Sequence, residues 1–255
     1  MSIIIFIISL AVLILVHECG HFLVAKWAGI RVDEFGLGFP PKIWSKKVGE
    51  TTYTLNLIPF GGFVKIFGED PHKEDILEKD RYRSMYYKPK WVQALVLFAG
   101  VAFNIIFAWL LISFSFMFKL PPHLALLQGL QTTYFLIENT TVGLGHFLWN
   151  IITLKADFSQ VSGPVGIAKV VEQAQSLGFR YLMSLIALIS VNLAVLNLVP
   201  FPALDGGRLL FILVEVIIGR PISSSFVRWA NAIGFLLLIV LMIFVTSHDI
   251  LRLYK

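Results

Sequence analysis

Residues 3–25 read IIIFIISLAVLILVHECGHFLVA, and all but one of the first fourteen residues of this stretch are apolar. An α-helix needs about 20 residues to cross the hydrocarbon core of a bilayer, so this stretch is predicted to span a membrane. No Lys or Arg precedes Lys26, and the basic start of a signal peptide is therefore missing. We expect the span to remain in the mature chain.

The composition of the whole chain agrees with a membrane environment. Of its 255 residues, 57% are hydrophobic and 15% are charged, whereas a soluble domain has about 25% charged residues. This composition excludes a disordered chain and argues against a soluble enzyme. Three further stretches reach spanning length, at residues 91–118, 182–204 and 230–247. The predicted fold class is an all-α polytopic membrane protein, a single domain with four transmembrane helices.

The positive charges predict the orientation of the spans. Residues 26–90 hold 12 of the 21 Lys and Arg residues, and basic loops stay in the cytoplasm. This loop is therefore predicted to be cytosolic, with both termini external and the first and third spans running in the same direction.

Residues 124–155 are apolar enough to suggest a fifth span, which would reverse the direction of the third span. Their polar residues recur at helical spacing opposite the apolar ones, a pattern typical of an amphipathic helix in the membrane interface. We therefore predict an external interfacial helix. The polar residues of this pattern are Gln128, Thr132, Asn139, His146 and Asn150.

A β-structure is predicted inside the cytosolic loop. Residues 52–67 read TYTLNLIPFGGFVKIF, two β-favouring runs separated by turn-forming residues at 59–62. This pattern indicates a membrane-associated β-hairpin. The following residues, 68–90, carry charges of both signs, which makes nucleic acid a poor partner for the chain.

The first span contains the motif HECGH at residues 17–21. His17 and His21 are four residues apart on a helix and project from one face, so both can bind one zinc ion. Glu18 can reach a water bound to that ion. The alternative is a pair of interface histidines with a snorkelling glutamate, but ionisable groups inside a span are costly and usually functional.

A catalytic zinc site typically has a third protein ligand, and Asp205 is the best candidate. It follows two prolines that must interrupt the third span, Pro200 and Pro202, and it precedes two glycines that permit a tight turn. If the first and third spans run in parallel, Asp205 lies at a depth compatible with the two histidines. The alternative is a simple Asp-Gly turn at the end of a helix.

The remaining polar residues of the spans are less informative. Asn197 suits either an interhelical hydrogen bond or a contact with substrate. Asn104 and Asn192 are expected to serve packing. Cys19 is the only cysteine, which excludes an internal disulfide, and it is expected to be a small packing residue.

With these motifs in place, the chain resembles the site-2 intramembrane metalloproteases of the bacterial regulator-of-sigma-E protease type. The resemblance covers nearly the whole chain. It rests on HECGH, EFGLGFPPKI, GGFVKIFGE, AGVAFN, SGPVGIA and NLVPFPALDGGR.

The resemblance implies one zinc ion per chain, bound by His17, His21 and Asp205, with Glu18 as the catalytic acid and base. It also implies that substrate contacts a stretch containing Asn197, Pro200 and Pro202. The expected substrates are single-span proteins of the bacterial cytoplasmic membrane, such as anti-sigma factors or remnant signal peptides.

Two departures from this family pattern stand out. Val101 occupies a position where the family usually has proline, and a local backbone difference is expected there. The chain also has no room for the PDZ domains that usually lie between the second and third spans. Either the chain is a naturally minimal member or that region has been removed.

A substrate helix must be locally unwound before its peptide bonds can be attacked. An edge strand of the predicted hairpin, at Gly62, Phe63 and Val64, could pair with an extended substrate. The alternative is a hairpin that only plugs the cytosolic mouth of the site. The main alternative function is a non-catalytic metal-binding membrane protein, such as a zinc permease or sensor.

Overall fold

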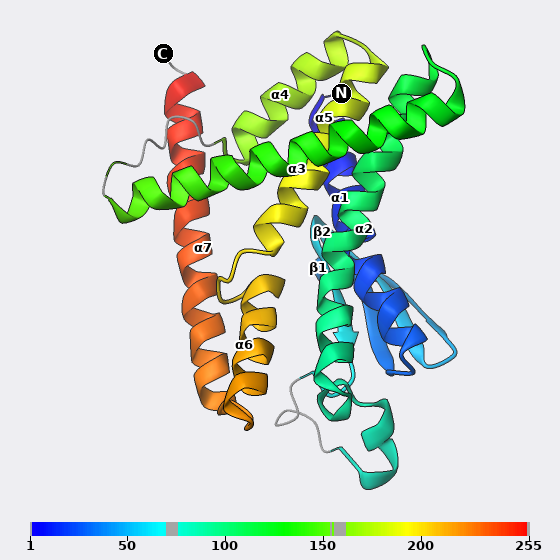
Figure 1. The fold of residues 1–255 in the computed structure, drawn as a ribbon, viewed down its shortest axis with the longest axis vertical. Helices are drawn as coiled ribbons and strands as arrows, with labels where there is room; N and C mark the ends of the chain where they lie inside the picture. The colour runs from blue at the N-terminus through cyan, green and yellow to red at the C-terminus, as the bar shows by residue number, and fades with distance from the viewer. Residues whose placement is uncertain (1, 70–75, 154, 156–161, 254–255) are drawn as a thin grey trace. The chain divides into compact units, whose positions relative to one another are not determined.

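The computed structural model describes residues 2–69, 76–153, 155 and 162–253 (Figure 1). Residues 70–75, within the charged stretch 68–90, and Leu154 of the predicted interfacial helix therefore lie outside the described residues. The elements are α1 (Ser2–Trp27), β1 (Val32–Val48), β2 (Thr51–Ile66), η1 (Glu78–Arg83), η2 (Met85–Tyr87), α2 (Lys90–Met117), α3 (Pro122–Ile152), α4 (Pro164–Ser176), α5 (Phe179–Asn197), α6 (Asp205–Ile218) and α7 (Ser224–Leu253).

Four of the described helices are long and apolar enough to cross a membrane, as the sequence predicts. They comprise Ile3–Trp27, Lys90–Met117, Phe179–Asn197 and Ser224–Leu251. The third of these ends at Asn197, seven residues before the predicted limit, because the two prolines that follow cannot continue a helix. The α3 helix has 31 residues but is not among the four. Its place in the membrane interface stays a prediction.

The chain forms two compact units. The first comprises Met1–Phe6, Ile105–Leu196 and Ile233–Lys255, and the second comprises Ile7–Asn104 and Asn197–Ala232.

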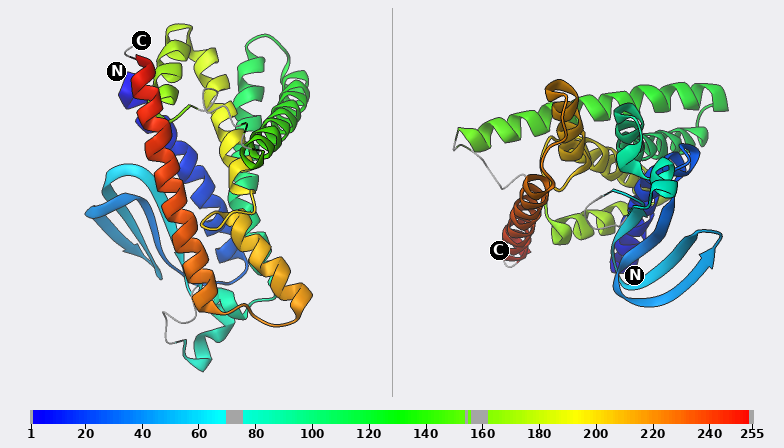
Figure 2. Two further views of the ribbon diagram at one scale, coloured as in Figure 1. Left: turned by 90° about the vertical axis from the view of Figure 1, so that its left-hand side faces the viewer. Right: turned by 90° about the horizontal axis from the view of Figure 1, so that it is seen from below.

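In the first unit, α3 crosses α5 (Figures 1 and 2). The hydroxyl of Thr140 on α3 donates a hydrogen bond of 2.9 Å to Asn192 on α5. Asn192 thus has the packing role expected from the sequence. The buried apolar core of this unit lies between α2 and α5 and consists of Ala108, Ile112, Ala187, Val191 and Val195.

A carboxylate connects α7 to the start of α4 in the same unit. The amide of Gly166 donates a hydrogen bond of 2.8 Å to Asp249, which is buried. A Cβ atom on Gly163 would lie 2.8 Å from the same carboxylate oxygen. The SGPVG motif therefore provides space for an acidic side chain at a helix N-terminus, where negative charge is favourable.

In the second unit, α1 and α2 pack at short distance. A Cβ atom on Gly20 would lie 2.4 Å from the carbonyl oxygen of Ala99, so only glycine permits this approach. The buried apolar core of this unit is formed by the end of α1, the start of α2 and the segments between them. It consists of Ala25, Ile30, Val32, Ile66, Met85, Val92, Val96 and Leu97.

The sheet of the second unit differs from the predicted hairpin. The two runs on either side of the predicted turn at 59–62 both belong to β2, and they do not pair with each other. Each pairs with β1, a strand that was not predicted from the sequence. Residues 34–37 of β1 pair with residues 52–55 on one side and with residues 62–65 on the other. No further strand pairs with 62–66 among the described residues.

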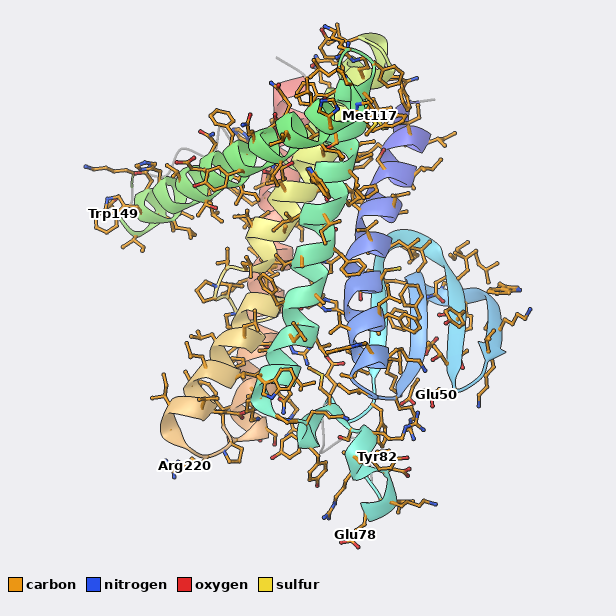
Figure 3. All side chains as sticks on the ribbon, turned by 45° about the vertical axis from the view of Figure 1, so that its right-hand side comes forward. Glu50, Glu78, Tyr82, Met117, Trp149 and Arg220 are labelled. Carbon is orange, nitrogen blue, oxygen red and sulfur yellow. The ribbon has the colours of Figure 1, made fainter. Side chains whose placement is uncertain are left out.

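The sheet lies beside α1 (Figures 1 and 3). The ring of Phe22 on α1 makes edge contacts with Phe35 and Tyr53, at centroid distances of 5.2 and 6.1 Å. At the turn between the strands, Glu50 accepts hydrogen bonds from Lys26 and Arg83. Aromatic packing and the Lys26–Glu50 contact together hold the sheet against α1.

Candidate metal centre

The two histidines of the HECGH motif lie side by side on α1. Their ring centroids are 4.8 Å apart and the ring planes are nearly perpendicular. The Nε2 atoms of His17 and His21 are 3.2 Å apart. The helical spacing predicted from the sequence therefore places the two nitrogen atoms close enough to bind one metal ion.

Asp205 completes this group, as expected. It is the first residue of α6, and its Oδ2 atom lies 3.0 Å from Nε2 of His17 and 3.2 Å from Nε2 of His21. All three side chains are largely buried, with 15% or less of each exposed. The three residues are the only group of three or more potential metal ligands found among the described residues.

The segment that leads into α6 has an unusual backbone. Ala203 has a φ of 75°, the only positive value of a non-glycine residue in the described part of the chain. Its amide donates a hydrogen bond of 3.0 Å to Oδ1 of Asn231 on α7. Left-handed backbone is costly for alanine and persists where the surroundings impose it. The Asn231 contact contributes to holding the turn that places Asp205.

The glycines after Asp205 permit the tight turn predicted for them. A Cβ atom on Gly206 would lie 2.3 Å from the carbonyl oxygen of Val199, and one on Gly207 would lie 2.2 Å from that of Phe201. The start of α6 therefore packs directly on the backbone of the preceding segment.

The two imidazoles contact one face of α2. Nδ1 of His21 donates a hydrogen bond of 2.8 Å to the carbonyl oxygen of Val96. Because a carbonyl only accepts, Nδ1 carries the proton and Nε2 of His21 has a free lone pair. One turn along α2, Gly100 leaves room for both rings, and one turn further Asn104 lies 3.4 Å from Nδ1 of His17.

The separations of the three ligand atoms fit a tetrahedral metal ion. Bonds of about 2.0 Å to zinc place the ligand atoms of a regular tetrahedron about 3.3 Å apart. The three observed separations are 3.0, 3.2 and 3.2 Å. Two imidazoles and one carboxylate are also the donor types that zinc prefers. Three protein ligands leave a fourth position open.

The charge of Asp205 suits a cation at this point. Burial opposes ionisation of the carboxyl group, but its close contacts with the imidazoles of His17 and His21 outweigh this effect. They hold the pKa of Asp205 well below its usual range. Asp205 therefore supplies a carboxylate to the site.

Glu18 lies on α1 next to the histidine pair and beside the edge of the sheet. A Cβ atom on Gly62 would lie 3.1 Å from Cγ of Glu18 and 2.9 Å from Cγ2 of Ile14. Gly62 pairs with Leu37 of β1, and Phe63 and Val64 follow it along β2. These three predicted substrate-binding residues thus belong to an outer segment of the sheet, and its first residue lies next to Glu18.

The other three predicted substrate-binding residues lead into Asp205 along the chain. Asn197 is the last residue of α5, and Pro200 and Pro202 lie in the connection to α6. Asn197 and Pro202 are partly exposed and Pro200 is exposed. Their contact with substrate stays a prediction.

Sequence reasoning assigned Asn104 to packing and did not identify Val96 or Asn231. The structure places Asn104 against His17, Val96 against His21 and Asn231 against the turn before Asp205. The spacing of four between Val96, Gly100 and Asn104 was visible in the sequence. The register of α1 against α2 was needed to show that these residues contact the histidines.

A profile of peptidase family M50 matches residues 5–241. The chain belongs to peptidase family M50. With its four apolar helices, this member of family M50 is a multi-pass membrane protein.

Two similar proteins illustrate the family. A protein of Clostridium perfringens (strain 13 / Type A), named "Putative zinc metalloprotease CPE1693", is 32% identical over 98% of this chain and 99% of its own length. "Zinc metalloprotease RasP" of Geobacillus kaustophilus (strain HTA426) is 25% identical over 99% of this chain and 98% of its own length. The names of these relatives of the M50 chain imply zinc as the metal.

Both relatives are longer than this M50 chain within the aligned region. The alignments extend over 340 and 418 positions, which exceed the 255 residues of the chain by 85 and 163. Between α2 and α5 the described residues form two helices and no strand.

Proposed function

We propose that the chain is an intramembrane zinc metalloprotease that hydrolyses peptide bonds within or near the transmembrane segments of single-span membrane proteins. The observation that supports this most directly is the convergence of His17, His21 and Asp205, with Glu18 adjacent on α1. Membership of family M50 agrees with it.

The proposed roles follow from the chemistry of the side chains. His17, His21 and Asp205 would hold one zinc ion. When bound, zinc supplies Lewis acidity that polarises a carbonyl and lowers the pKa of a coordinated water toward 7. Glu18 would accept the proton of the attacking water and deliver it to the leaving amine. Glu18 is thus essential for hydrolysis but is not a ligand.

The sheet supports a mechanism for holding the substrate. A peptide bond inside a helix is protected, because its carbonyl is hydrogen-bonded within the helix. Residues 62–66 form an outer segment of the sheet next to Glu18. An unwound substrate segment would add to this edge as a further strand and regain its backbone hydrogen bonds. Asn197, Pro200 and Pro202 are proposed to contact the same segment.

The main experiment uses the purified full chain in detergent with a model single-span substrate. We expect cleavage by the unmodified protein, loss of cleavage on addition of a zinc chelator, and recovery when zinc is restored. Glu18→Gln should abolish cleavage but keep about one zinc ion per chain. Absence of cleavage by the zinc-loaded, unmodified protein, together with zinc uptake into vesicles, would instead support the permease alternative.

A proline scan tests the role of the edge strand. Val64→Pro removes a backbone donor from the 62–66 segment, and Lys46→Pro makes the same change in the 44–48 segment, which pairs only with 51–55. Val64→Pro should slow cleavage of a stable helical substrate more than that of a substrate already unwound by helix-breaking residues. Lys46→Pro should not discriminate between the two substrates. Equal slowing of both substrates by Val64→Pro would favour the plug alternative.

We further propose that the protein resides in the bacterial cytoplasmic membrane, with the loop 26–90 cytosolic, both termini external and α3 in the external interface. The basic residues of the loop support this orientation. Reporter fusions at the C-terminus and within the loop should report opposite sides of the membrane.

Anti-sigma factors and remnant signal peptides are the proposed physiological substrates. Uncleaved forms of the true substrates should accumulate in cells that express Glu18→Gln.

A further inference from the structure

The residues of α2 that contact the histidines recur every four positions, at Val96, Gly100 and Asn104. His17 and His21 are four residues apart on α1, and each of their Nδ1 atoms faces a residue of α2. His21 faces Val96 and His17 faces Asn104, with Gly100 midway between them. Since the residue numbers rise in opposite directions, the two helices are antiparallel at this point.

Asn104 is an unusual residue for its position. It is 0% exposed, and it lies in the interior of a helix, Lys90–Met117, that is long and apolar enough to cross a membrane. Polar side chains inside a membrane span are costly and usually functional. Its Nδ2 atom lies 3.4 Å from Nδ1 of His17, on the side of the imidazole opposite the ligand group. Asn104 therefore borders the metal centre without being a ligand.

The hydrogen bonds fix where the protons lie in the arrangement observed. An amide nitrogen only donates, so Nδ1 of His17 accepts and carries no proton. The proton of a neutral His17 is then on Nε2, which lies 3.0 Å from the carboxylate oxygen of Asp205 that accepts it. In this set of protons, Nε2 of His17 is the donor within the group, and it faces both the carboxylate of Asp205 and the lone pair of His21.

Metal binding needs the opposite tautomer of His17. A nitrogen that binds a metal must present a lone pair, so Nε2 would lose its proton and Nδ1 would carry one. A protonated Nδ1 needs an acceptor, and an amide supplies one when it turns by 180° and exchanges Nδ2 for Oδ1.

We propose that Asn104 is a positioning residue whose amide sets the tautomer of His17, with Oδ1 accepting the Nδ1 proton when metal is bound. This inference rests on the proposed zinc function. His21 has a fixed acceptor, because the carbonyl of Val96 cannot turn. Of the two groups that contact the Nδ1 atoms, only the Asn104 amide can therefore change its orientation when metal binds.

Metal affinity provides the first test. Zinc dissociation constants are measured by chelator competition for the full chain in detergent, for the unmodified protein, Asn104→Leu, Asn104→Asp and Ser113→Ala. Asn104→Leu has no acceptor and should bind zinc about 10 to 100-fold more weakly, the range typical of lost partners of metal-binding histidines. Asn104→Asp keeps an acceptor and should bind at least as tightly as the unmodified protein. Ser113→Ala removes a buried hydroxyl from the same helix and should have no effect.

The tautomer itself provides the second test, first in the unmodified protein and then in the Asn104 variants. Nitrogen NMR of imidazole-labelled protein should show His17 protonated at Nε2 without metal and at Nδ1 with zinc. The cobalt-substituted protein should change its visible spectrum in Asn104→Leu and regain it in Asn104→Asp. An unchanged zinc affinity in Asn104→Leu, or the same His17 tautomer with and without zinc, would overturn the proposal. Failure of the unmodified protein to bind zinc would overturn the proposed function as well, whereas normal zinc binding without proteolysis would affect the proposed function alone.

Discussion

A Cβ atom on Gly100 would lie 2.6 Å from Nε2 of His21. The same atom would lie 2.7 Å from Cε1 of His17. Both distances are far below a van der Waals contact, so the backbone of α2 directly supports the two imidazoles.

Gly100→Ala should therefore displace at least one imidazole and abolish stoichiometric zinc binding. Elemental analysis of the purified protein measures the zinc content. Gly143→Ala on α3 is the matched control, because a Cβ atom there would meet nothing within 4 Å. The control should keep its zinc, and its helix should gain up to about 1 kcal/mol from the better propensity of alanine. A full zinc content in Gly100→Ala would show that the rings have more freedom than the structure indicates.

The turn before Asp205 depends on a contact from α7. Asn231→Ala removes the acceptor of the Ala203 amide and should lower the free energy of unfolding by about 0.5–1.5 kcal/mol, with weaker zinc binding. Ala203→Gly relieves the positive φ and should recover about 1 kcal/mol in the same background. Thermal unfolding in detergent and chelator competition measure the two effects. If Ala203→Gly lowered stability further, the backbone strain assigned to Ala203 would be refuted.

The buried carboxylate of Asp249 should stabilise the junction of α4 and α7. Asp249→Ala leaves the amide of Gly166 without its acceptor, and a loss of about 1–3 kcal/mol is expected. Asp249→Asn keeps an acceptor oxygen and should lose less. Lys169→Ala, an exposed change on α4, is the control and should have little effect. Thermal unfolding ranks the three variants, and equal stability of Asp249→Ala and the control would contradict this role.

The turn of the sheet should confer a pH dependence on stability. Hydrogen bonds from Lys26 and Arg83 lower the pKa of Glu50 below its ordinary value of 4.5. A group with a lowered pKa in the folded state stabilises the protein above its unfolded pKa, and this contribution disappears as the pH falls through the folded pKa. The unfolding temperatures of the unmodified protein and Glu50→Gln should thus differ at pH 7. The difference should shrink as the pH falls below 4.5 and vanish once the pH is below the lowered pKa of Glu50. A constant difference would argue against ionic stabilisation.

The sequence predicts the spans and the ligand group because both depend on local patterns. Long apolar runs mark the helices, and the HECGH spacing places His17 and His21 together on any helix. Asp205 is predicted from topology, since the prolines before it interrupt a span and the predicted parallel direction of two spans places it at a depth similar to that of the histidines.

The sheet is harder to predict because its pairing is not local. Residues 34–41 read EFGLGFPP, and glycine and proline indicate turns when they are read alone. In the structure this stretch lies in β1, and residues 34–37 lie between two segments of β2. The alternation within 52–67 indicates strands but not their partners.

Asn104 could not be assigned from local patterns either. A single polar residue in an apolar helix is compatible with packing, a ligand role or a contact to a ligand. The register of α1 against α2 decides between these roles, and that register follows from a close approach at Gly20 that only the assembled helices reveal.

The matched spacing of four on α1 and α2 limits how this part of the protein can evolve. One residue inserted between Val96 and Asn104 would rotate one of these two positions by about 100° around the helix axis and remove it from its imidazole. The length of this stretch is therefore fixed, and so is Gly100 within it, because a Cβ atom there would overlap both imidazoles. Gain or loss of residues in this lineage is expected to be confined to segments outside it.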